Sequence, residues 1–264
     1  MMKIMPKFKD YFLVFKDYFL VISLTLFFLS LISLVPLTEA RADDIEFQTG
    51  MTQSYFGKFS KELGAALSYK ALSPAEPLGI LGFDVGLEVS ATNIDEGAAY
   101  WKLATKNADM PSLIPLPKIY VRKGLPFNID VGAIYSKVPD SNISLLGAEV
   151  KYAILKGSVA TPAVAIRGSY TQLMGVDQLD FKTYGADVSI SKGFLNITPF
   201  GGIGAVWTSS EPKSLPAGIS LNKENNTQIK YFGGVRFTLL LLNMTAGVEY
   251  MEVPTYSIRA GIIF

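Results

Sequence analysis

The side chains that most often carry catalysis are scarce in this sequence. It contains neither histidine nor cysteine, which removes imidazole bases, thiolate nucleophiles, Cys-based metal sites and disulfides. Asp95 with Glu96 and Asp177 with Asp180 could support carboxylate-only hydrolysis, although such acids in polar segments are usually solvated charges or loose cation ligands. We therefore predict no enzyme activity, no catalytic residue, no metal site and no cofactor, and keep a carboxylate-based hydrolase as a distant alternative.

A larger set of charged residues alternates with apolar ones. In Leu81–Ala91, Asp84 and Glu88 point one way if Val85 and Leu87 point the other, because a period of two places neighbours on opposite faces of a strand. Extending this phase along the chain puts six acids and seven bases on one face. The predicted inward charges are Asp84, Glu88, Lys118, Arg122, Asp130, Glu149, Lys151, Arg167, Asp187, Lys230, Arg236, Glu249 and Arg259.

Such charges need strands that enclose a shared interior. Stretches of about ten alternating residues have the length that a tilted strand needs to cross a bilayer. Ten are found: Leu81–Ala91, Ile119–Leu125, Phe127–Ser136, Leu146–Ile154, Val164–Tyr170, Tyr184–Ile190, Ile197–Trp207, Ile229–Phe237, Leu242–Tyr250 and Tyr256–Phe264. We predict an all-β fold, a transmembrane antiparallel up-and-down barrel of about ten strands over residues 80–264. Opposite charges in its narrow lumen should pair.

The connections between these strands support a membrane barrel. Segments 95–115 and 209–226 are long and polar, whereas most of the others are short. Transmembrane barrels have short periplasmic turns and long outer loops. If the last strand ends in the periplasm, both long segments fall on the outer side.

A soluble β-sandwich would also alternate, with its apolar face hidden as a core. The polar face argues against it, since it holds many glycines, including Gly86, Gly132 and Gly247. Glycine weakens a solvent-exposed strand but lets side chains share a cramped interior. A narrow lumen explains this composition better.

The first 42 residues resemble a secretory signal. Four lysines precede a nearly uncharged run at 18–37, and Ala40-Arg41-Ala42 forms a small-x-small cleavage site. An uncleaved membrane anchor is the alternative, because the run is about as long as a membrane span. Cleavage after Ala42 leaves 19 basic and 20 acidic residues of the original 24 and 23, so no nucleic-acid-binding field is expected.

The C-terminal strand carries a recognisable pattern. Apolar residues alternate with polar or small ones and end on an aromatic residue; the pattern comprises Tyr256, Ile258, Ala260, Ile262 and Phe264. In this the sequence resembles the small Gram-negative outer-membrane barrels, whose assembly signal has this form. It is also similar to uncharacterised outer-membrane proteins. The resemblance covers about residues 80–264 and implies location in the outer membrane, contact with its lipid, and handling by the export and barrel-assembly machinery.

Residues 43–79 do not alternate. Between Ser54 and Lys70 the apolar residues follow steps of three and four, which favours an amphipathic helix. We predict a partly helical segment that lies in the periplasm or plugs the barrel. The alternative is two further strands, Ile45–Gln53 and Leu63–Leu72, which would give twelve.

These patterns predict an integral outer-membrane barrel with a structural or small-solute passage role and a salt-bridged lumen. The solute is not specified by the sequence. The alternative is a surface-binding or adhesion barrel that acts through loops 95–115 and 209–226, where Tyr100, Trp101 and Leu103 could contact a ligand or lie on the rim.

Overall fold

The computed structural model describes residues 45–105, 111–138 and 142–264. The predicted cleavage residues Ala40 and Ala42 lie outside this range. No helix in the described part of the chain is long and apolar enough to span a membrane.

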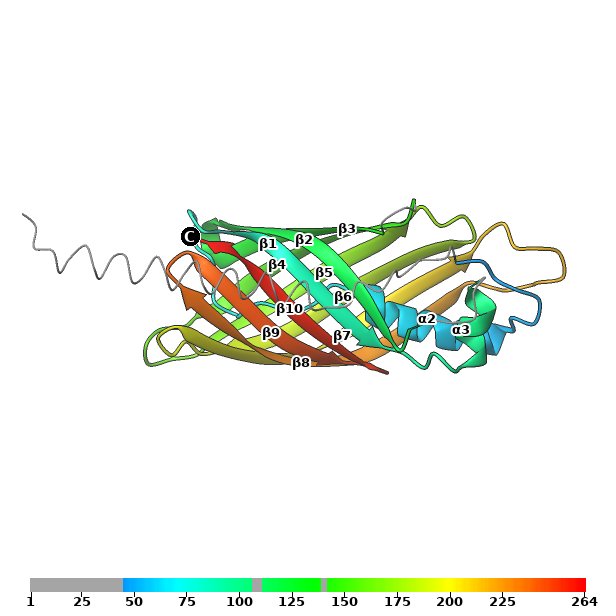
Figure 1. Cartoon of the computed structure of the whole chain (residues 1–264). Helices are drawn as coiled ribbons and strands as arrows, with labels where there is room; N and C mark the ends of the chain where they lie inside the picture. Colours follow the sequence, from blue (N-terminus) through cyan, green and yellow to red (C-terminus); the bar gives the residue numbers. More distant parts are fainter. Residues whose placement is uncertain (1–44, 106–110, 139–141) are drawn as a thin grey trace, which may run out of the picture. The chain divides into compact units, whose positions relative to one another are not determined.

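Ten antiparallel strands close into a barrel (Figure 1). Each strand pairs with its sequence neighbours, and β1 pairs with β10. The strands are β1 (Phe83–Asn93), β2 (Leu113–Leu125), β3 (Ile129–Lys137), β4 (Ser144–Lys156), β5 (Ala163–Met174), β6 (Leu179–Ser191), β7 (Ile197–Pro212), β8 (Glu224–Leu239), β9 (Leu242–Tyr250) and β10 (Pro254–Ile263). The predicted ten-stranded barrel is confirmed, and the twelve-stranded alternative is wrong.

The alternation of residue types decides which face of each strand points inward. Leu87 on β1 is 53% exposed, whereas its neighbour Glu88 is 1% exposed. Glu88 is in register with Arg259 on β10 and with Lys118 on β2. The charged residues therefore meet inside the barrel while the apolar residues cover its outside, as expected for a barrel in lipid.

The barrel closes where the first and last strands meet. Phe83 and Phe264 exchange two backbone hydrogen bonds, with N···O distances of 2.8 and 3.0 Å. Their rings lie 5.8 Å apart. The predicted assembly-signal residues Tyr256, Ile258, Ala260, Ile262 and Phe264 follow the outward phase of β10 to this seam. Recognition by assembly machinery stays a prediction.

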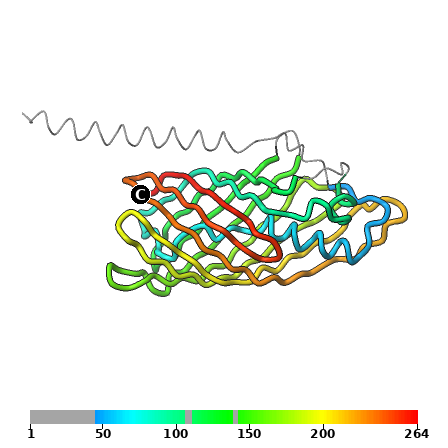
Figure 2. Tube along the Cα trace, turned by 60° about the horizontal axis from the view of Figure 1, so that its bottom comes forward, coloured from blue at the N-terminus to red at the C-terminus, as the bar shows by residue number. Residues whose placement is uncertain are grey.

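The two ends of the barrel differ. At the end that carries the C-terminus the connections are short, including the 3-10 turn η1 (Pro126–Asn128) and the segment 240–241. The opposite end carries the connections 94–112 and 213–223, and the first of these contains the helix α3 (Ala99–Ala104). Figure 2 shows the two ends in a second view. We call them the short-turn end and the long-loop end.

Several strand bounds differ from those predicted. Phe127, expected to begin a strand, lies in η1 with a positive φ of 64°. β2 begins at Leu113, so Pro115 and Pro117 belong to a strand. Both prolines lie where β2 pairs with β1 alone, and a missing N–H is tolerated at such an unpaired edge. β7 and β8 likewise continue the ladder into the polar segment expected to be loop.

The N-terminal segment lies within the barrel. Its helix α2 (Gln53–Leu67) begins after Thr52, whose hydroxyl accepts a hydrogen bond from the backbone N–H of Tyr55. The predicted helix is confirmed, although it ends before Lys70. Figure 1 shows α2 at the long-loop end and the following chain passing toward the short-turn end. We call residues 45–79 the plug.

Candidate functional site: the charged lumen and its plug

All thirteen charged residues predicted to face inward are buried. Arg236 is the most exposed of them, at 7%. Each takes part in at least one ion pair with an N···O distance below 4 Å. Residues that line a water-filled pore keep contact with solvent, so this burial means that the lumen is filled.

Arg122 is the centre of the largest ion-pair network. Its Nε donates to Glu149 at 2.7 Å, and its two terminal nitrogens lie 3.4 Å from Asp84 and from Asp130. Each carboxylate also has another cation, and for Asp84 this is Arg236 at 3.3 Å. A guanidinium suits this role because its donors point in several fixed directions.

The same network continues around the barrel wall. Arg167 lies 3.4 Å from Glu149 and 3.6 Å from Asp187. Lys230 then joins Asp187, at 3.1 Å, to Glu249, at 3.8 Å. Charges of alternating sign thus follow one another around the wall, which is how a low-dielectric interior can hold many ions.

A second, smaller cluster forms around Glu88. Its two carboxylate oxygens accept from Lys118 at 2.8 Å and from the Arg259 guanidinium at 2.6 Å. The Arg259 guanidinium also lies over the ring of Tyr120, 4.2 Å from the ring centroid. This cation–π contact adds to the ion pair in a buried site.

The plug contributes a lumen cation that the sequence analysis did not identify as one. Lys70 follows α2, is 2% exposed, and lies 3.2 Å from Glu249. Its spacing from Phe56, Phe59 and Leu63 puts it at the end of the apolar helix face predicted from the sequence. A lysine on that face was the available signal, because a cation among buried residues needs a carboxylate partner.

Lumen charges also hold the extended part of the plug. The ammonium group of Lys151 donates to the carbonyls of Pro74 and Glu76, both at 2.8 Å. Asp130 accepts from the backbone N–H of Leu78 at 2.9 Å. Charged wall residues therefore satisfy backbone groups that would otherwise be buried without partners.

Apolar contacts fill the space between these polar ones. Leu72 packs with Phe200 and Phe232 of the wall, and Tyr69 packs with Tyr120 and Ile134. Ile134 is the residue that breaks the alternation of its strand, so its inward position is explained by contact with the plug.

Glycine on the wall makes room for the plug. A Cβ added at Gly247 would lie 2.7 Å from the Leu72 side chain and 3.0 Å from the Gly233 carbonyl. Both distances are shorter than ordinary contacts. At this position the inner face needs glycine because a side chain of the plug lies against it.

Glu62 of α2 ties the plug to the long loop. It accepts hydrogen bonds from the Tyr100 hydroxyl at 2.7 Å and from the Trp101 indole N–H at 2.6 Å, both on α3. The backbone N–H of Asp95 donates to it as well, at 3.3 Å. Burial, together with the hydrogen bond to Glu62, raises the pKa of Tyr100 above its usual range. The tyrosine therefore remains a donor at neutral pH.

The two aromatic rings of this loop face the plug. Tyr100 is 8% exposed and Trp101 is 2% exposed. The Trp101 ring lies 5.0 Å from Phe59 of α2 in an edge-on arrangement. Both rings therefore anchor the plug, and a surface-binding role for loops 95–115 and 209–226 stays a prediction that depends on other side chains.

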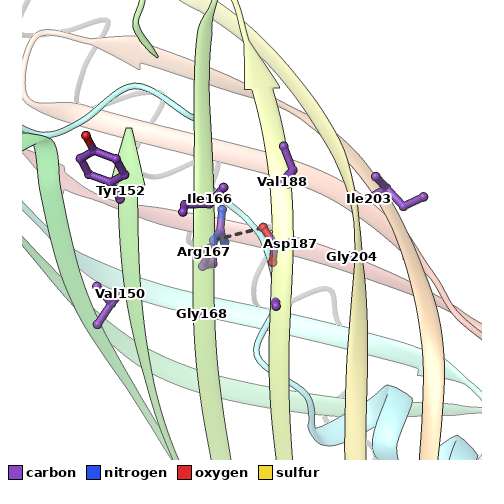
Figure 3. A pocket seen from close by; sticks show the side chains of 10 residues that line it. Val150, Tyr152, Ile166, Arg167, Gly168, Asp187, Val188, Ile203 and Gly204 are labelled. Carbon is purple, nitrogen blue, oxygen red and sulfur yellow. Dashed lines mark ion pairs between the residues drawn. The ribbon is translucent and has the colours of Figure 1, made fainter. Parts of the chain in front are cut away.

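The outer surface carries an apolar groove of about 500 Å³ over β4–β7. Figure 3 shows Val150, Tyr152 and Ile203 among the side chains that line it, with the paired Arg167 and Asp187 close by. That charged pair is buried in the lumen. The groove is a depression in the lipid-facing surface, where Gly168 leaves open space.

Asp180, one of the carboxylates considered for hydrolysis, lies at the start of β6 and not in a loop. It pairs with Lys182 at 3.1 Å and with Lys213 at 3.0 Å. Among the described residues, no group of three or more carboxylates is arranged to hold a metal ion.

Comparison with known proteins gives only distant structural likenesses. No family model matches the sequence, and no curated protein matches it. The attachment invasion locus protein Ail of Yersinia pestis is 16% identical, with a TM-score of 0.35 over 69% of this chain and 97% of that one. The translocator domain of the autotransporter NalP from Neisseria meningitidis is 10% identical, with a TM-score of 0.42 over 80% of this chain and 95% of that one. Neisserial surface protein A is 11% identical, with a TM-score of 0.29 over 69% of this chain and 94% of that one.

The location of the protein follows from its own surface. A closed barrel with an apolar exterior and an interior of paired charges suits lipid outside and polar contacts inside. Aromatic residues such as Tyr184, Trp207 and Tyr256 are exposed on that exterior. The protein is an integral β-barrel of the Gram-negative outer membrane.

Proposed function

We propose that this barrel is held shut by its own plug, and that small solutes pass only when the plug moves. The observation that carries the proposal is the ion pair between Lys70 of the plug and Glu249 of the wall, at 3.2 Å. Lys70 also donates to the Ala65 carbonyl and, at 3.2 Å, to the Ser68 hydroxyl. The same ammonium group thus connects the extended part of the plug to the end of α2 and to β9.

The contacts of the plug favour a seal that can be released. Most of its polar anchors are single hydrogen bonds or ion pairs to wall side chains, such as those of Lys151 and Asp130, and its backbone does not pair with the barrel strands within the lumen. A segment held by side chains can leave without breaking the backbone hydrogen bonds between the barrel strands. A strand of the sheet could not leave without breaking them.

The lumen left by a displaced plug would be positively charged. The paired set contains six carboxylates and seven wall cations, and removal of Lys70 would free Glu249 to pair with Lys230 alone. We therefore propose weak preference for small anions. No catalytic step is part of this function.

Single-channel recording in planar bilayers tests the proposal. The wild-type chain should show long closed periods, and Lys70→Glu should open frequently, because it places two carboxylates opposite each other in a buried site. Lys61→Glu is the matched control. It makes the same change of charge at a residue of α2. Lys61 pairs with Glu252 at the surface, where both side chains are more than 40% exposed.

Steady wild-type conductance at low voltage would show that the plug is no seal. Equal opening frequencies for Lys70→Glu and Lys61→Glu would show that the Lys70–Glu249 pair does not hold it. Heat-modifiable migration on gels establishes that each variant is folded. If Lys70→Glu does not fold, Lys70→Gln is used in its place.

A further inference from the structure

The plug crosses the barrel in a defined direction. Its first residues contact the long-loop end. Ile45 pairs with Thr105, and the backbone N–H of Gln48 donates to the Leu103 carbonyl at 2.8 Å. The backbone N–H of Phe47 donates to the side chain of Gln178, in the β5–β6 connection, at 2.8 Å.

The last residues of the plug lie at the other end. Gly82 donates to the Gly79 carbonyl in a turn, and Phe83 then pairs with the C-terminal Phe264. The side chain of Lys123, near the end of β2, donates to the carbonyl of Ile80. The plug therefore begins among the long loops and ends among the short turns.

The length of the plug agrees with this path. Fifteen helical residues in α2 span about 22 Å at 1.5 Å per residue. The eleven residues 68–78 can add up to about 36 Å when extended. The apolar band of an outer-membrane barrel is about 25 Å tall, so the segment is long enough to pass through the lumen.

The chemistry of the segment excludes a path through lipid. It carries Lys58, Lys61, Glu62 and Lys70, and charges of this kind are costly in hydrocarbon. Inside the lumen, Glu62 and Lys70 meet the donors and acceptors described above. The interior of the barrel is the one polar route that joins the two ends.

We infer that the barrel carries its own N-terminal segment across the outer membrane and presents residues around Thr49 and Ser54 on the cell surface. This rests on the outer-membrane location given above and on the expectation, from the lengths of the connections, that the short turns face the periplasm. Both ends of the strand array then face the periplasm, while the plug begins outside.

Single-cysteine labelling tests the inference, since the chain has no native cysteine. Thr49→Cys and Ser54→Cys place a thiol at exposed positions of the plug. Ala217→Cys marks a long loop, and Val159→Cys, at a 99% exposed position, marks a short turn. A membrane-impermeant maleimide is applied to intact cells and, separately, to cells with a permeabilised outer membrane.

The expected result is that Thr49→Cys and Ser54→Cys are labelled in intact cells as strongly as Ala217→Cys, whereas Val159→Cys is labelled at least tenfold more after permeabilisation. Labelling of both plug positions only after permeabilisation, while Ala217→Cys reacts in intact cells, would overturn the inference. If Val159→Cys reacted in intact cells and Ala217→Cys did not, the barrel would face the other way and the surface position of Thr49 would be wrong. The two controls therefore test the orientation of the barrel separately from the path of the plug, and conductance tests the seal.

Discussion

At the scale of single residues, the stability of the lumen depends on cations that each serve several carboxylates. Arg122 reaches Asp84, Asp130 and Glu149 at once. Removing one partner from a buried ion pair is strongly destabilising, because it leaves charge without compensation. The loss is moderated here, since each of the three carboxylates keeps a second cation.

We expect Arg122→Met to lower the free energy of unfolding by about 3 kcal/mol, toward the lower end for a broken buried pair. Equilibrium unfolding in urea from lipid vesicles, followed by tryptophan fluorescence, measures it. Lys61→Met is the control, because its exposed pair with Glu252 should contribute at most about 1 kcal/mol. Equal losses for the two variants would mean that the buried network adds no more than a surface pair.

The inward charges were predictable from the sequence because of one physical rule. A strand places every second side chain on the same face, so fixing Asp84 and Glu88 as inward fixes the remaining members of that strand. Their partners were not predictable. Which cation meets Glu149 depends on the register between strands, and alternation alone does not specify it.

At the scale of elements, the strands were easier to predict than their ends. Alternation is strongest where one face meets lipid, and it weakens where both faces are polar. β8 begins at Glu224 and the polar run that follows still pairs with β7, because backbone hydrogen bonds do not require apolar side chains. For this reason β7 and β8 are longer than expected, and the loop between them is shorter.

The plug shows another limit of sequence analysis. The spacing of Phe56, Phe59 and Leu63 was enough to predict a helix with one apolar face. It could not specify what that face meets, and the face packs on Phe47 and on Trp101 of α3. The surroundings of Lys70 and Glu62 come from segments far away in the sequence, so no local pattern could reveal them.

The fit between plug and wall can be tested with two glycines. Gly247→Val should lower the free energy of unfolding by about 1–3 kcal/mol, the usual cost of overpacking, because the new side chain overlaps Leu72 and the Gly233 carbonyl. Gly168→Val should be neutral or slightly stabilising, since a Cβ there meets open space on the lipid side and branched residues favour strands. Urea unfolding measures both.

Limited trypsin digestion shows whether the plug is the element affected. Cleavage after Lys58 or Lys61 should be faster in Gly247→Val than in Gly168→Val if the plug loosens. If the digestion rates are equal and the two free energies of unfolding match, the close contact at Gly247 is not important for holding the plug.

At the scale of the whole molecule, the barrel separates two environments across the thickness of one strand. Leu87 and Glu88 are consecutive residues, yet one is 53% exposed on the outside and the other is 1% exposed within. Lipid stabilises the exposed apolar side chain, and the ion-pair network stabilises the buried carboxylate. The closed form of the sheet is what allows both, because it leaves no edge with unpaired backbone groups.

This separation predicts where a positive charge is tolerated. Leu87 lies near the middle of β1, so Leu87→Arg should lower the free energy of unfolding from lipid vesicles by about 2–4 kcal/mol, the cost of arginine near the bilayer midplane. Val159→Arg, in an exposed turn between β4 and β5, should change it by at most about 1 kcal/mol, because a side chain there reaches water. If Leu87→Arg were as well tolerated as Val159→Arg, the face that carries Leu87 would not be in contact with lipid. The inward charges would then have to be explained without a membrane.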